Sequence, residues 1–84
     1  MKDLNPVLNL LGEVAEDRTV PRNIRSAVNE AKSYLEDKTK DMDLKISSAI
    51  SILDEVINDP NIPMYTRTQI WNIVTILESL KAQK

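Results

Sequence analysis

The feature that most constrains this chain is an internal repeat. Residues 4–36 align with residues 46–78 at a constant offset of 42 positions. Apolar residues match in the first part of each segment: Leu4/Ile46, Val7/Ala49, Leu8/Ile50, Leu10/Ile52, Leu11/Leu53, Val14/Val56 and Ala15/Ile57. Identical or closely similar residues continue the match: Glu13/Glu55, Asp17/Asp59, Val20/Ile62, Pro21/Pro63, Arg25/Arg67, Val28/Ile70, Leu35/Leu77 and Glu36/Glu78. A repeat of this kind is typical of a duplicated helix–turn–helix unit.

The apolar residues of both segments recur at helical spacing and form a broad stripe that would face a core. The pattern predicts helices over about 4–17, from Pro21 to about 36, from Asp41 or Asp43 to about Asn58, and from Pro63 to near the end. Proline favours the first turn of a helix, so Pro21 and Pro63 are expected to start the second and fourth helices. Because no segment alternates as a strand would, we expect no sheet.

The chain is therefore predicted to be a single all-α domain over 1–84, with repeat 1 at 4–36, a polar linker at 37–43 and repeat 2 at 46–78. Short links favour a four-helix antiparallel up-and-down bundle built from two repeated helical hairpins. A period of about 40 residues also fits a HEAT-like array, and both arrangements use the same four helices.

Composition removes most catalytic chemistry. The 84 residues include no His, no Cys and one Gly, so the commonest general base, thiolate chemistry and a glycine-rich phosphate loop are absent. The adjacent carboxylates Glu16/Asp17 and Asp54/Glu55 diverge on a helix, while Asp41 and Asp43 lie in the linker. We predict no enzymatic activity, no catalytic residues, no metal site and no cofactor.

The same composition predicts a cytoplasmic protein. No apolar run approaches the roughly 20 residues that span a bilayer, and polar residues interrupt the N-terminal segment as they would not in a signal peptide. The net charge of -2 argues against general coating of nucleic acid, although a local basic patch could still bind it.

In an up-and-down bundle the two matching turns, 17–25 and 59–67, lie at the same end. A set of polar residues gathers there as a candidate anion or partner surface: Arg18, Arg22, Asn23, Arg25, Asn61, Tyr65 and Arg67. The simpler interpretation is structural, with Asp17–Arg25 and Asp59–Arg67 pairing across each turn. The alternative is a binding site for phosphate, an RNA or DNA backbone or an acidic segment, because three arginines crowd a helix start that usually carries acidic residues.

The last predicted helix is more apolar than one core-facing stripe requires. It carries no charge between Arg67 and Glu78, and Trp71, Val74 and Ile76 are the candidate self-association residues. The helix is either buried between two neighbours with Trp71 covering the core, or shared with a partner, most simply in a symmetric homodimer.

Three segments carry a family resemblance: EDRTVPRNIRSA (16–27), SAISILDEVINDPNIP (48–63) and RTQIWNIVTILE (67–78). They resemble a family of small archaeal proteins catalogued as uncharacterised, and the resemblance covers nearly the whole chain. It implies a compact all-helical domain from an archaeon, and it implies no activity.

Together these observations predict a small non-enzymatic helical module that binds a protein partner or a second copy of itself. The alternative is a nucleic-acid or ribonucleoprotein-associated protein that binds phosphates through the arginine-rich turn.

Overall fold

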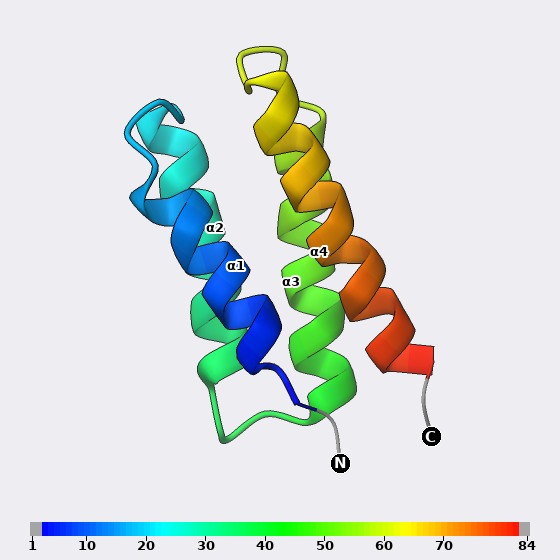
Figure 1. Ribbon diagram of the computed structural model, residues 1–84. Helices are drawn as coiled ribbons and strands as arrows, with labels where there is room; N and C mark the ends of the chain where they lie inside the picture. Colours follow the sequence, from blue (N-terminus) through cyan, green and yellow to red (C-terminus); the bar gives the residue numbers. More distant parts are fainter. Residues whose placement is uncertain (1–2, 83–84) are drawn as a thin grey trace.

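A computed structural model describes residues 3–82, and within that range the regular structure is entirely helical. The helices are α1 (Asn5–Glu16), α2 (Arg22–Glu36), α3 (Met42–Ile57) and α4 (Met64–Ala82). Successive helices run in opposite directions, so the chain runs along the bundle alternately up and down (Figure 1). The predicted all-α bundle is confirmed. The first two and last two residues of the predicted domain 1–84 lie outside the described residues.

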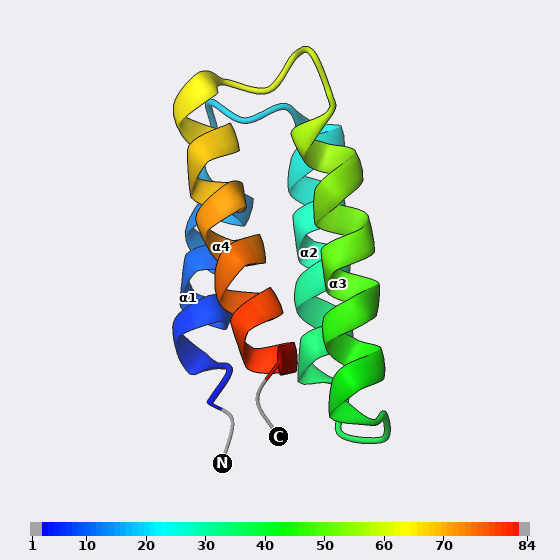
Figure 2. The same cartoon turned by 90° about the vertical axis from the view of Figure 1, so that its right-hand side faces the viewer.

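The four helices form a closed ring. Helix α1 packs against α2 and α4, and α3 packs against the same two neighbours, whereas no diagonal pair is in contact among the described residues. Figure 2 shows the α1/α4 pair beside the α2/α3 pair. The result is a bundle of 36 × 20 × 19 Å rather than an open array of hairpins. This closed arrangement also brings the loops of both hairpins to one end.

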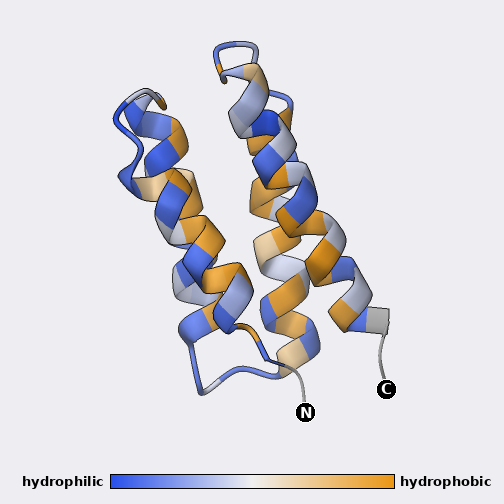
Figure 3. Cartoon of the chain, in the orientation of Figure 1, coloured by the Kyte–Doolittle hydropathy of each residue, from blue (hydrophilic) through white to orange (hydrophobic). Residues whose placement is uncertain are grey.

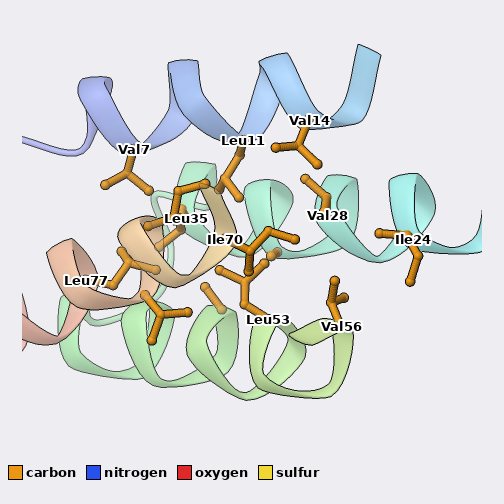
Figure 4. Close-up of a cluster of buried hydrophobic side chains, with 14 of the residues drawn as sticks. Val7, Leu11, Val14, Ile24, Val28, Leu35, Leu53, Val56, Ile70 and Leu77 are labelled. Carbon is orange, nitrogen blue, oxygen red and sulfur yellow. The ribbon is translucent and has the colours of Figure 1, made fainter. Parts of the chain in front are cut away.

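The core runs along the axis of the ring and follows the repeat. Leu11 and its equivalent Leu53 are both fully buried, as are Leu35 and Leu77 to within a few per cent. Figure 4 shows these side chains meeting between the helices, while Figure 3 shows hydrophilic residues on the loops and outer faces. The buried apolar residues are Val7, Leu11, Val14, Val20, Ile24, Val28, Ala31, Leu35, Ile46, Ala49, Leu53, Val56, Ile62, Ile70, Ile73, Val74 and Leu77. Burial of such side chains, at about 1.5–3 kcal/mol each before entropy is subtracted, is the main stabilising term.

All three interhelical turns contain the same hydrogen bond between an aspartate side chain and the backbone. The carboxylates of Asp17, Asp37 and Asp59 each accept a hydrogen bond from the backbone N–H two residues later, at 2.9, 2.9 and 2.8 Å. Aspartate stabilises turns in this way because its short side chain can mimic a backbone acceptor. The sequences DRT, DKT and DPN therefore make the same side-chain contact just after α1, α2 and α3.

Proline sets the starts of α2 and α4 as predicted, with each helix beginning one residue after it. The carbonyl groups of Pro21 and Pro63 accept the first helical hydrogen bonds, from Arg25 N and Arg67 N, each at 3.0 Å. A proline ring fixes φ near its helical value and lacks only an N–H that would have no partner there. The two hairpins thus turn through equivalent contacts.

Candidate functional site

The end of the bundle that carries the α1–α2 and α3–α4 loops gathers the polar residues predicted from sequence. We call this region, residues 17–25 and 59–67, the turn end. Figure 2 shows the two loops running one above the other there. The up-and-down path of the chain accounts for this, because odd-numbered helices end and even-numbered helices begin at the same end.

Two hydrogen bonds join the hairpins reciprocally at the turn end. Asn23 Nδ2 donates to Asp59 Oδ2 at 3.4 Å, and Tyr65 donates its hydroxyl to Asp17 Oδ2. Asn23 and Tyr65 are equivalent positions of the repeat, as are Asp59 and Asp17. Each hairpin therefore donates from the same position to the turn aspartate of the other hairpin, and we call this pair of contacts the reciprocal clasp.

The contact between Tyr65 and Asp17 shifts the pKa of both residues. The Thr19 hydroxyl, the Tyr65 hydroxyl and the Thr19 N–H all donate to Asp17, and with the more distant charge of Arg25 they hold its pKa below the ordinary 3.8. The same contact raises the pKa of Tyr65 above 10.0, because the negative Asp17 carboxylate accepts a hydrogen bond from the phenolic O–H and would repel a phenolate. The ionised aspartate and the neutral tyrosine are therefore the favoured pair.

The two turn arginines are held differently from the sequence expectation. That expectation paired Arg67 with the Asp59 carboxylate, whereas Arg67 Nη2 donates to the main-chain oxygen of Asp59 at 3.1 Å. Arg25 acts on Asp17 through its charge. The Nε atoms of both arginines are buried and have no hydrogen-bond partner among the described residues. The arginine stems thus pack into the turn, as structural residues do.

Among the remaining candidates at the turn end, one makes a hydrogen bond within the molecule and two are exposed. Asn61 donates its backbone N–H to Asp59, which also receives the Asn23 contact. Arg18 and Arg22 are the exposed arginines of this end. Of the polar residues predicted to gather here, Asn23 and Tyr65 therefore bond across the two hairpins, whereas Asn61 and Arg67 bond within their own turn.

A shallow groove opens beside the turn end, between α2 and α3. It has a volume of about 220 Å³. Its lining residues are Asn23, Ile24, Ala27, Ile52, Glu55, Val56 and Asp59. Within residues 3–82, no three acidic, His or Cys side chains gather to hold a metal ion.

The outer face of α4 presents a different kind of surface. Trp71 is 57% exposed and Met64 is 76% exposed. Both lie on a row of exposed side chains spaced 4, 3, 4 and 3 residues apart, which we call the α4 stripe: Met64, Thr68, Trp71, Thr75 and Glu78. The predicted self-association set is therefore divided: Trp71 is on the surface, Ile76 is half-buried, and Val74 is 6% exposed and belongs to the core.

Sequence analysis missed two features. Met64 was treated only as part of a turn motif, although its place one helical turn before Thr68 puts it on the exposed row. Thr66 was not singled out, yet it is fully buried and its hydroxyl has no hydrogen-bond partner among the described residues. The repeat offered a signal, because position 66 is equivalent to the buried Ile24.

Fold and surface together define a small all-helical protein made of two similar helical hairpins. The chain belongs to the Uncharacterised protein family UPF0147, whose sequence model matches residues 1–80. A UPF0147 protein of Methanocaldococcus jannaschii is 47% identical over 93% of this chain and 84% of its own length. One of Methanothermobacter thermautotrophicus is 46% identical over 92% and 76%, respectively. The family is thus one of small archaeal proteins, as the resemblance indicated.

Two solved structures confirm the fold. A crystal structure of a UPF0147 family protein from Thermoplasma acidophilum has a TM-score of 0.89 at 39% identity and covers 92% of this chain and 91% of that chain. The crystal structure of the unknown function protein MMP1188 has a TM-score of 0.84 at 42% identity, with 94% and 97% covered. None of the described helices is both long and apolar enough to cross a membrane.

Proposed function

We propose that this protein is a small non-enzymatic interaction module that binds a protein partner through the outer face of α4. The observation that carries the proposal is the exposure of Trp71 in the middle of a ten-residue stretch, 68–77, that contains no charged residue. Tryptophan is enriched among the residues that contribute most to binding at protein interfaces. Charged residues are depleted at the centres of such interfaces, as they are in this stretch.

The α4 stripe is also less polar than its sequence suggests. The hydroxyls of Thr68 and Thr75 donate to the carbonyl oxygens of Met64 and Trp71, at 3.2 and 2.9 Å. A threonine whose hydroxyl proton is already bonded to its own helix loses little hydrogen bonding when a partner covers it. The stripe can therefore be buried at a lower desolvation cost than free hydroxyls would impose.

The phosphate-binding alternative has weaker support. Of the seven candidate residues at the turn end, Asn23 and Tyr65 already bond to aspartates of the opposite hairpin, and the charge of Arg25 acts on Asp17. An anion site needs cationic groups that converge without such competition. We therefore place the interaction on α4.

A photo-cross-linking residue in place of Trp71 tests the proposal in extract of the source cells. Benzoylphenylalanine keeps the aromatic bulk, and the same residue in place of Tyr34, an exposed aromatic on α2, is the matched control. We expect a protein adduct of defined mass at position 71 and none at position 34. Equal labelling at both positions, or no adduct at position 71, would contradict the proposal.

A further inference from the structure

The α4 stripe has a regular geometry that restricts what can pack on it. Its exposed residues lie 4, 3, 4 and 3 positions apart, which is the seam spacing of two helices packed side by side. Reversal about residue 73 exchanges Thr68 with Glu78 and Trp71 with Thr75. The part of the stripe from Thr68 to Glu78 therefore maps onto itself, as a two-fold interface requires, in which residue i contacts j and j contacts i.

We propose, resting on the function proposed above, that the partner is a second copy of this chain, whose α4 packs antiparallel on the first about a two-fold axis at residue 73. In this register each Trp71 lies opposite the Thr75 of the second copy. A large side chain thus faces a small one whose hydroxyl is already satisfied within its own helix. The two-fold axis makes this contact twice, so the tryptophans of both copies are covered.

Charge complementarity supports this register. Arg67 and Glu78 both lie on the same flank of the stripe, because residues 11 apart on an α-helix differ by only about 20°. The two-fold operation keeps flanks together, so each Arg67 meets the Glu78 of the second copy, offset by one residue or about 1.5 Å along the axis. The bond from Arg67 to the Asp59 carbonyl holds that guanidinium in place. Such pairs contribute register and specificity more than affinity.

A disulfide test distinguishes this register from others, since the chain has no cysteine of its own. Positions 68 and 78 face each other across the predicted axis, but within one helix they are about 15 Å apart, too far for a disulfide. Under mild oxidation the double variant Thr68→Cys/Glu78→Cys should form a covalent dimer. The single variants Thr68→Cys and Glu78→Cys, as matched controls, should remain largely uncross-linked.

Efficient cross-linking of either single variant would indicate a parallel or shifted pairing and overturn the proposal, as would a double variant that stays uncross-linked. The outcome is separable from that of the proposed function. If the cross-linker at position 71 captures a different protein and the double-cysteine chain forms no dimer, the second copy is excluded and the interaction module stands. If position 71 captures nothing, the proposed function itself fails.

Discussion

The phenolic hydroxyl of Tyr65 donates a hydrogen bond to the carboxylate of Asp17, which lies 48 positions earlier in the chain. The contact joins the start of α4 to the end of α1, and its counterpart from Asn23 to Asp59 joins α2 to the end of α3. Equivalent positions of the two hairpins, 23 and 65, therefore each bond to the turn aspartate of the other hairpin. Two of the residues that the sequence placed in a candidate ligand site, Asn23 and Tyr65, thus bond between the hairpins.

Removing the tyrosine hydroxyl should loosen this end. We expect Tyr65→Phe to lower the thermal midpoint by less than any truncation in the core, because the contact is exposed to solvent. Tyr34→Phe makes the same chemical change away from the clasp and should have no effect. In a double-mutant cycle, Tyr65→Phe with Asp17→Ala should cost less than the two single changes together. Full additivity would show that the two side chains are not coupled.

Acid should destabilise the protein through its turn aspartates. The folded-state pKa values of Asp17 and Asp37 lie below the ordinary 3.8, for Asp37 mainly because the Thr39 hydroxyl and N–H donate to it. A lowered carboxyl pKa contributes stability above 3.8 that is lost as the pH falls through the folded-state value. Urea midpoints measured from about pH 6 to pH 2 should fall steeply at the acid end.

The variants Asp17→Asn and Asp37→Asn separate the two contributions. Each should be less stable than the parent at neutral pH and should lose less stability on acidification, because the group that titrates is gone. A variant with the parent's full acid dependence would assign that dependence to other carboxylates.

Replacing Thr66 with an apolar residue should stabilise the protein. Its hydroxyl is fully buried without a partner among the described residues, and an unsatisfied buried hydroxyl costs about 1–3 kcal/mol. Valine has nearly the same shape, so Thr66→Val should raise the free energy of unfolding by about 1 kcal/mol. Thr68→Val, on the exposed side of the same helix, should change it by about 0.5 kcal/mol or less. Denaturant titration measures both, and a destabilised Thr66→Val would reveal a bond that the hydroxyl makes.

Gly12 offers a second stabilising change. It lies within α1, its φ is not positive, and a Cβ there would come no closer than 3.8 Å to its nearest neighbour, Lys32 Nζ. Because glycine inside a helix costs about 0.5–1 kcal/mol relative to alanine, Gly12→Ala should stabilise the protein by that amount. A loss of stability would mean that α1 and α2 pack too closely here for a methyl group.

The positions of the four helices could be predicted from the sequence, because the signals that start and end a helix are local. Pro21, Pro63 and the turn aspartates mark helix ends, and each predicted boundary lies within a residue or two of the observed one. The predicted common end for the two turns also follows from connectivity. The short spacing between Asp17 and Arg25 was likewise enough to predict that they lie close together across a tight turn.

Contacts between the hairpins could not be read in the same way. That Tyr65 meets Asp17, and that Asn23 meets Asp59, depends on how the two hairpins are rotated in the ring. Val74 illustrates the same limit on burial. Apolar residues cover so much of α4 that the sequence could not separate the side facing the core from the side facing solvent.

Sedimentation equilibrium of the unmodified protein measures whether the outer face of α4 binds a second copy of the chain, as we propose. At concentrations up to about 1 mM we expect a mass approaching twice the 9.5 kDa of one chain. Trp71→Ala should raise the dissociation constant by about tenfold or more, while Tyr34→Ala should leave it unchanged. A mass of 9.5 kDa at every concentration, or equal dissociation constants for the parent and Trp71→Ala, would contradict the claim.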